Sequence, residues 1–139
     1  MNSENKRGEQ SGFEMKKRIL VIDDNEDLRR VTRAFLEQAG MEVLESTSNK
    51  ETLQICARQQ VHLLVMDIFL DNELSLDAAL EMAKDPAYYG RPKIIAVSGT
   101  IGGELIKSKS FLVENHIDCF LKKPFHFNEL VDKINELLQ

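Results

Sequence analysis

Five short apolar runs along this chain are each followed by a longer segment whose apolar residues recur at helical spacing. Such alternation is typical of a parallel sheet covered by helices on both faces. The run at 61–66 is almost wholly apolar, as expected for a central strand. We therefore expect an α/β protein with a doubly wound, five-stranded parallel sheet and five flanking helices. The expected strands are 19–22, 42–45, 61–66, 93–97 and 117–121, and the expected helices are about 27–39, 49–57, 75–84, 104–115 and 127–139.

Local signals mark the ends of two of these helices. Ser48 and Glu51 lie three residues apart and predict a capping box at the start of the second helix. The third helix starts near Ser75 or Asp77 and is expected to end before Asp85-Pro86.

The expected apolar face of the first helix consists of Leu28, Val31, Phe35, Leu36 and Ala39.

Composition limits the domain count and the classes of partner. With 139 residues, 42% of them hydrophobic, the chain is expected to form one domain with its own core. Residues 1–15 are polar and unpatterned, so we interpret them as a flexible N-terminal extension or a cloning remnant, and the domain as 16–139. A net charge of −5 argues against direct nucleic-acid binding.

Three further features bear on location. No apolar run reaches the length of a membrane span, and no signal peptide opens the chain. Cys56 and Cys119 lie in periodic apolar stretches without metal-site spacing, so we expect buried, reduced thiols. Together these features predict a cytoplasmic protein without membrane contact.

Residues suited to phosphoryl chemistry follow four of the five expected strands. Asp23 and Asp24 follow the first strand, Asp67 the third, Ser98 the fourth and Lys123 the fifth. In an open parallel sheet the ligand crevice lies outside the carboxyl ends of the strands, so these residues are expected to converge there. Three carboxylates, a hydroxyl and an ammonium group would then share one pocket.

Each of these residue types has a chemical reason to be there. Asp67 can act as a nucleophile toward a phosphoryl group and form an aspartyl phosphate. Clustered carboxylates repel one another unless a cation neutralises them, and oxygen ligands around a phosphoryl site favour Mg²⁺. Lys123 and Ser98 can stabilise the phosphoryl oxygens, and Gly99 has no side chain to obstruct them. The neighbouring Lys122 is expected to face solvent, because successive strand residues point to opposite faces.

In order and position, the acidic pair, the lone Asp67, Ser98 and the run Lys123-Pro124-Phe125 resemble the receiver domain of bacterial two-component response regulators, stand-alone type. The resemblance covers about residues 16–139. It implies a flavodoxin-like fold with strand order 2-1-3-4-5. It also implies that Asp67 accepts a phosphoryl group from a sensor histidine kinase or a histidine phosphotransfer protein. Such a domain is a phosphoacceptor rather than an enzyme, with autophosphorylation and autodephosphorylation chemistry at most.

The resemblance implies specific roles at the metal site. Asp24 and Asp67 would bind Mg²⁺ directly, Asp23 would bind it through water, and the backbone carbonyl of Phe69 would complete the protein ligands.

The resemblance also implies a switch. Phe120 would turn inward as the Ser98 hydroxyl moves toward the phosphoryl group; an ordinary core role for Phe120 is the other reading. Pro124 would carry a cis peptide bond that directs Lys123 into the pocket, although trans is the commoner state for any proline. The weak fourth helix would be the mobile element, and a partner protein would read the change on the surface formed by the fourth helix, fifth strand and fifth helix.

Some residues depart from the family pattern. Asp71 stands where the family usually has Pro, and no Gly follows it before Leu76, where the family usually has one. Asp71 and Glu73 could add charge beside the metal or could simply belong to a solvated loop. His116 replaces a usual Gly after the fourth helix, and we interpret it as a helix terminator in the left-handed conformation.

Two other functions stay open at this point. The altered loop favours a pseudo-receiver that binds proteins without being phosphorylated. A hydrolase with an aspartyl intermediate, similar to haloacid-dehalogenase-like phosphatases, is less well supported, because Asp67-Ile68-Phe69 lacks the second acid of their Asp-x-Asp pattern.

Overall fold

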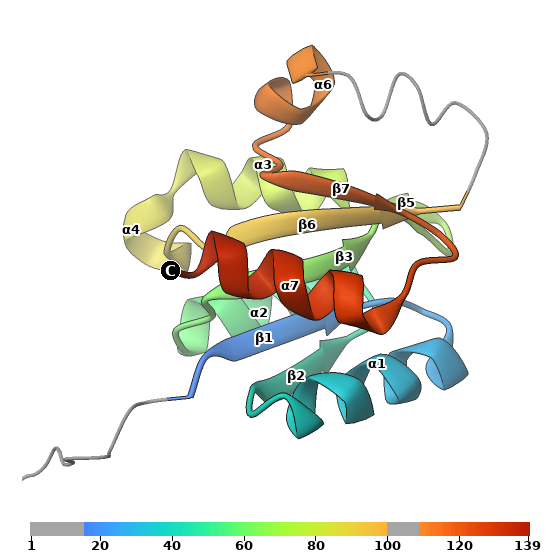
Figure 1. The fold of residues 1–139 in the computed structure, drawn as a ribbon. Helices are drawn as coiled ribbons and strands as arrows, with labels where there is room; N and C mark the ends of the chain where they lie inside the picture. Colours follow the sequence, from blue (N-terminus) through green and yellow to red (C-terminus); the bar gives the residue numbers. More distant parts are fainter. Residues whose placement is uncertain (1–15, 100–108) are drawn as a thin grey trace, which may run out of the picture.

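A parallel five-stranded sheet forms the centre of the computed structural model, which describes residues 16–99 and 109–139 (Figure 1). The strand order is β2-β1-β3-β6-β7, with every neighbouring pair parallel. This order confirms the doubly wound, flavodoxin-like fold implied by the resemblance. The strands of this sheet are β1 (Arg18–Ile22), β2 (Glu42–Ser46), β3 (Leu63–Asp67), β6 (Lys93–Ser98) and β7 (Cys119–Lys122).

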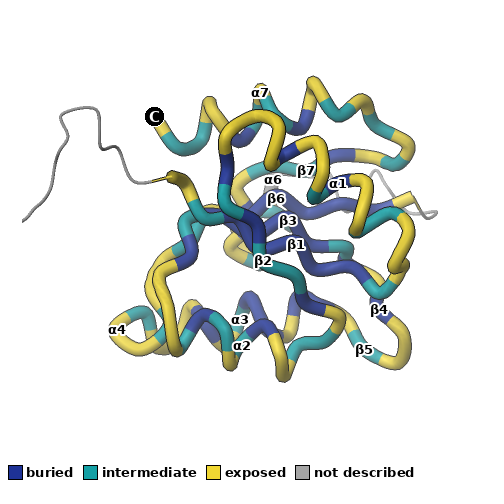
Figure 2. Tube along the Cα trace, turned by 90° about the horizontal axis from the view of Figure 1, so that it is seen from below, coloured by how far each residue is buried: buried dark blue, intermediate teal, exposed yellow. Residues whose placement is uncertain are grey.

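Helices cover both faces of the sheet (Figures 1 and 2). The helices α1 and α7 lie against one face, and α2 and α3 lie against the other. The helices in the described residues are α1 (Glu26–Gln38), α2 (Asn49–Arg58), α3 (Leu76–Lys84), α4 (Pro86–Tyr89), α6 (Lys109–Glu114) and α7 (Phe127–Leu137).

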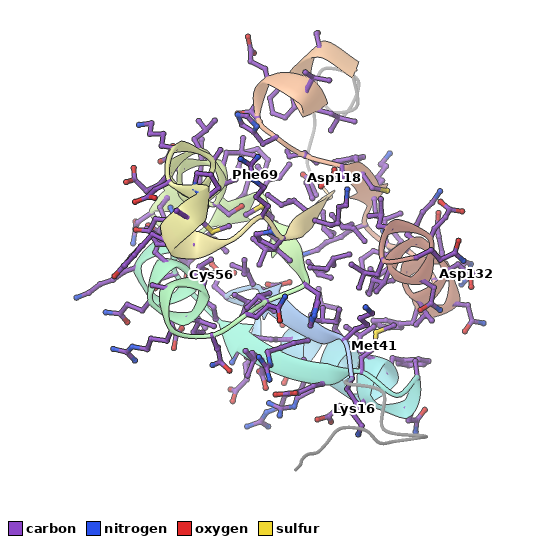
Figure 3. All side chains as sticks on the ribbon, turned by 90° about the vertical axis from the view of Figure 1, so that its left-hand side faces the viewer. Lys16, Met41, Cys56, Phe69, Asp118 and Asp132 are labelled. Atoms are coloured by element: carbon purple, nitrogen blue, oxygen red, sulfur yellow. The ribbon has the colours of Figure 1, made fainter. Side chains whose placement is uncertain are left out.

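The core consists of two layers of apolar side chains, one on each side of the sheet (Figure 3). Alternation along the strands separates the layers: Ile19 and Val21 face the α1 and α7 side, whereas Leu20 and Ile22 face the α2 and α3 side. All four are at most 3% exposed, so burial on both faces explains why β1 is apolar at consecutive positions.

Two expectations about the helices differ from the structure: the burial of the apolar face of the first helix and the number of five helices. The expected one-sided face of the first helix is not buried as a unit, because Thr32 and Leu36 are the buried residues of α1, whereas Val31 and Phe35 are 46% and 42% exposed. The Phe35 ring instead stacks on Phe127 of α7, with ring centroids 4.4 Å apart. Asp85-Pro86 does end α3, but the proline also begins α4, so the described residues contain a sixth helix; proline suits a first helical position.

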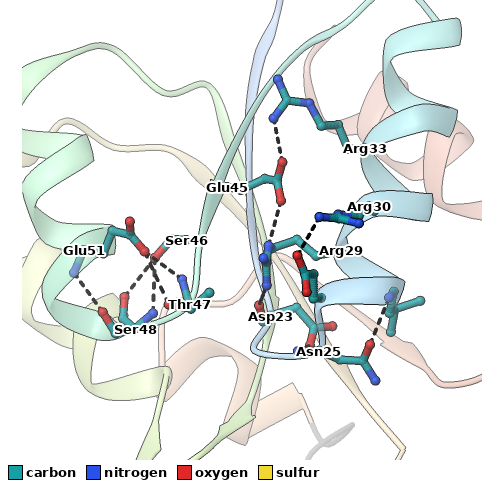
Figure 4. Close-up of polar contacts among 12 residues, drawn as sticks. Asp23, Asn25, Arg29, Arg30, Arg33, Glu45, Ser46, Thr47, Ser48 and Glu51 are labelled. Atoms are coloured by element: carbon teal, nitrogen blue, oxygen red, sulfur yellow. Dashed lines mark hydrogen bonds and ion pairs between the residues drawn. The ribbon is translucent and has the colours of Figure 1, made fainter.

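The capping box at α2 is confirmed, with one difference. The Ser48 hydroxyl accepts a hydrogen bond from the Glu51 amide at 3.1 Å. The Glu51 carboxylate accepts the amide of Thr47, at 2.9 Å, rather than that of Ser48. Both side chains therefore satisfy amide donors at the entrance to the helix (Figure 4).

A short hairpin that the sequence did not lead us to expect follows β3. Strands β4 (Phe69–Leu70) and β5 (Glu73–Leu74) pair in antiparallel fashion. Asn72 between them has a φ of 65°, in the left-handed region that asparagine tolerates.

Three individual predictions can be compared with the backbone and the burial. His116 has a φ of 60°, which confirms the left-handed terminator after α6. The Lys123-Pro124 peptide bond is cis, as the resemblance implies. Both cysteines are free thiols; Cys56 is buried as expected, but Cys119 is only partly buried. Residues 104–108, the first part of the expected fourth helix, lie outside the described residues, as do residues 1–15.

Candidate functional site

The carboxyl ends of the strands bring one lysine and two aspartates together. Asp23 follows β1, Asp67 is the last residue of β3, and Lys123 follows β7. The Lys123 ammonium lies 2.9 Å from the Asp67 carboxylate and 3.3 Å from that of Asp23. Residues 100 positions apart in the sequence therefore share one charge cluster, as the topology predicts.

A third carboxylate completes an acidic group. Asp23, Asp24 and Asp67 can each place one carboxylate oxygen within 4.8 Å of the others. Three oxygen donors this close fit a hard divalent cation such as Mg²⁺, which takes carboxylate and water ligands. Asp24 also accepts a hydrogen bond from the Asp71 amide at 2.6 Å, so the hairpin touches this group.

The charges in the cluster are unbalanced. Burial raises the pKa of Asp67, and the negative charge of Asp23 adds to that effect, while the contact with Lys123 opposes it. Burial lowers the pKa of Lys123, but the hydrogen bond and charge of Asp67, with the charge of Asp23, outweigh it and leave this pKa raised. The lysine is thus held as an ammonium ion. One ammonium cannot offset three carboxylates, so a further cation is favourable here.

The end of β6 lies against Lys123. Ser98 is 2% exposed, and its carbonyl accepts the Lys123 amide at 2.9 Å. A Cβ atom added to Gly99 would lie 3.2 Å from the Cβ of Lys123, a tight contact. Glycine therefore makes room for the lysine itself, a reason that sequence analysis missed. Lys122 is exposed, as alternation predicts.

Ser75, which sequence analysis did not assign to the site, helps to hold the loop after Asp67. The Ser75 hydroxyl, which is fully buried, donates to the Asp67 carbonyl at 2.6 Å. The Phe69 amide donates to the Asp67 carboxylate at 3.2 Å, and Phe69 is 42% exposed. In the sequence, Ser75 stands out only by its position at the start of the third expected helix.

Glu73 and Asp71 have different surroundings. The Glu73 carboxylate accepts the Asn49 amide at 2.9 Å, at the first residue of α2. It therefore caps this helix and is not one of the three clustered acids. Asp71 is exposed beside Asp24, whose negative charge raises the Asp71 pKa.

Phe120 occupies a partly buried position on β7. It pairs in register with Ala96 of β6 and packs against the core layer on the α2 and α3 side. The residues of α6 that share this layer are Phe111 and Leu112. Phe120 thus packs against the same core layer as these residues of α6.

A family profile and curated relatives match the chain. The profile of the response regulator receiver domain matches residues 19–135. The CAI-1 autoinducer sensor kinase/phosphatase CqsS of Vibrio cholerae is 30% identical over 118 residues, which are 85% of this chain and 17% of that protein. The response regulator SaeR of Staphylococcus aureus is 28% identical over 120 residues, 86% of this chain and 50% of that protein. The chain thus spans half or less of the length of these relatives.

Solved structures show the same fold. A CheY-like response regulator receiver domain protein from Methanospirillum hungatei has 26% identity and a TM-score of 0.77, over 89% of this chain and 94% of that one. The receiver domain of the Saccharomyces cerevisiae response regulator Ssk1, crystallised with the histidine phosphotransfer protein Ypd1, appears in a structure with 19% identity and a TM-score of 0.76, over 88% and 89% of the chains.

In the part of the chain that the structure describes, no helix combines the length and apolarity needed to cross a membrane. The fold, the acidic group at the strand ends and the profile match agree with one another. The chain therefore belongs to the response regulator receiver domain family, whose members are signalling modules of two-component systems.

Proposed function

We propose that this receiver domain takes a phosphoryl group onto Asp67 from a phosphohistidine, in a reaction that requires Mg²⁺. The observation that carries the proposal is the contact of Lys123 with both Asp67 and Asp23 beside the acidic group. Asp24, Asp67, the carbonyl of Phe69 and, through water, Asp23 would hold the ion. When bound, Mg²⁺ supplies positive charge for the phosphoryl oxygens.

The chain's own residues account for the rest of the transfer. A carboxylate oxygen of Asp67 forms a bond to phosphorus as the bond from phosphorus to the donor imidazole breaks, and the departing imidazole takes up a proton from solvent. The Lys123 ammonium lies 2.9 Å from Oδ2 of Asp67, so it can also stabilise the negative charge of the phosphoryl oxygens. Ser98, which is buried at the end of β6, would supply a hydroxyl group to the phosphoryl oxygens.

The donor would be a sensor histidine kinase or a histidine phosphotransfer protein, as the likeness to CqsS and to the Ypd1-bound receiver supports. The readout would pass to a partner protein on the surface of α6, β7 and α7, with Phe120 as the switch residue. Exposed Val113 on α6 offers that surface an apolar contact. Free thiols suit the cytoplasm, and the net charge of −5 disfavours direct nucleic-acid contact.

Intact-mass analysis after incubation with acetyl phosphate and Mg²⁺ tests the acceptor. We expect one phosphoryl adduct that hydroxylamine removes, because hydroxylamine cleaves acyl phosphates. The adduct should be absent from Asp67→Asn. It should persist in Asp77→Asn, a matched change of an exposed aspartate in the first turn of α3.

The same experiment separates the rival functions. Protein that binds Mg²⁺ but forms no adduct would identify a pseudo-receiver, which the unusual β4–β5 hairpin makes the stronger rival. Steady turnover of a generic phosphate ester, lost in Asp67→Asn, would instead identify a hydrolase.

A further inference from the structure

We infer that Arg29 of α1, fixed by Glu45 of β2, is a positioning residue for the turn that carries Asp23 and Asp24, and that it thereby sets the affinity of this turn for a divalent cation. The inference rests on the metal site proposed above. It concerns residues that are not among the expected ligands or phosphoryl-binding groups.

One guanidinium group makes both contacts (Figure 4). The Nη1 of Arg29 donates to the Asp23 carbonyl at 2.9 Å, and its Nε donates to Glu45 at 2.7 Å. The Arg29 and Glu45 side chains are only 14% and 23% exposed. A planar guanidinium has its donors in fixed directions, so anchoring one edge to Glu45 aims the other edge at the carbonyl.

The Asp23 carbonyl is a sensitive point of the turn. It belongs to the peptide plane that joins Asp23 to Asp24, so rotation of this plane changes the backbone dihedrals of both residues. Other contacts hold the rest of Asp23: its amide donates to the Ser46 carbonyl at 3.1 Å, and its carboxylate accepts the Asn25 amide at 2.9 Å. Arg29 therefore completes the fixation of a residue that is 6% exposed.

In the alternative interpretation, these ion pairs only connect α1 to β2 and have no role at the acidic turn. Arg33 provides the comparison, because it binds the same carboxylate of Glu45 at 2.6 Å, whereas its pair with Glu37 stays within α1. Arg30 provides a second comparison: it pairs with Glu26 on the same helix, and both side chains are largely exposed. A tie between elements would need Arg29 and Arg33 alike, whereas positioning of the turn needs Arg29 alone.

Calorimetric titration of the full, metal-free chain with Mg²⁺ tests the inference. We expect Arg29→Met to weaken Mg²⁺ binding about 10-fold, the lower end of the usual effect of removing a group that orients metal ligands. Arg33→Met and Arg30→Met should bind Mg²⁺ like the wild type. Arg29→Lys keeps the charge but not the forked geometry, so it should fall between wild type and Arg29→Met, and it serves if Arg29→Met does not fold.

Amide hydrogen exchange in metal-free protein gives a second readout. Arg29→Met should speed exchange at the Asp23 and Asn25 amides relative to both control variants. Equal Mg²⁺ affinity in wild type, Arg29→Met and Arg29→Lys, or equal weakening in Arg29→Met and Arg33→Met, would overturn the inference. If the wild type binds no Mg²⁺, the proposed metal site fails, and exchange alone decides: unchanged rates in Arg29→Met then overturn the positioning role as well.

Discussion

Lys123 shows how much of this site depends on a single side chain. Its ammonium contacts carboxylates from two other strands, so it links β7 to β1 and β3 through charge. The lysine was predictable because it follows an apolar run and precedes Pro124 and Phe125. The Arg29 contact was not, because nothing in the sequence relates an arginine of α1 to Glu45 of β2, 16 positions away.

The two cysteines should differ in reactivity. Burial raises the pKa of Cys56 to about 11, and its side chain is 4% exposed in the layer between α2 and the sheet. Burial also raises the pKa of Cys119, but that residue is only partly buried. At mildly alkaline pH we expect an aromatic disulfide reagent to modify Cys119 first and Cys56 only as the protein unfolds.

Cys119→Ser provides the control, because it should remove the fast phase and leave the slow phase unchanged. Two thiols that react at the same rate in folded protein would contradict the burial of Cys56.

At the scale of elements, the β4–β5 hairpin joins the acidic group to α2. The Asp71 amide contacts Asp24 at one end, and Glu73 and Leu74 contact Asn49 at the other. Sequence analysis located a departure from the family here but could not describe it. The hairpin depends on contacts with Asp24 and Asn49, which are distant in the sequence, and its strands have only two residues each, too few for a periodic signal.

Removal of the Glu73 cap should destabilise the protein. Glu73→Ala leaves the Asn49 amide, at the first turn of α2, without its side-chain acceptor. We expect a loss of about 1 kcal/mol in the free energy of unfolding, measured by urea titration, in line with other helix caps. Glu73→Gln keeps an acceptor oxygen and should lose less. Equal stability of all three proteins would show that water replaces the cap.

At the scale of the whole molecule, the sheet was the most predictable feature. The three central strands β1, β3 and β6 are nearly continuous apolar runs because helices cover both faces. The strand order places the acids and the lysine together at the carboxyl ends of the strands. Helix faces were less predictable. Val31 and Phe35 have helical spacing but remain half exposed, and Phe35 stacks on Phe127 of α7.

Acid should weaken the link between α1 and β2. The hydrogen bond from Arg33 lowers the pKa of Glu45 below its ordinary value of 4.5, with a further contribution from Arg29 against the opposing effect of burial. The stabilisation is therefore complete above that ordinary value and is lost as the pH falls through the pKa of the folded state. We expect Glu45→Gln to cost about 1 kcal/mol at neutral pH, measured by urea titration, and progressively less in acid.

Glu42→Gln, on the same strand, is the matched control. Glu42 pairs with Arg18 but is 44% exposed, so its replacement should change stability by less than about 0.5 kcal/mol. A Glu45→Gln penalty that stays constant down to acid unfolding would mean that Glu45 does not titrate in the folded state as described.

The position of β7 at the edge of the sheet restricts what can follow β6. Lys123 must reach from the edge strand to Asp67 across the end of β6, a span of two strand spacings, or roughly 10 Å. Ser98 and Gly99 lie at the end of β6, which this side chain has to cross. A Cβ atom at residue 99 would already make a tight contact with Lys123. Residue 99 must therefore be small, because a larger side chain would obstruct Lys123 on its way to Asp67. In a comparison of many variants, the effect of a substitution at residue 99 should follow the volume of the new side chain rather than its polarity.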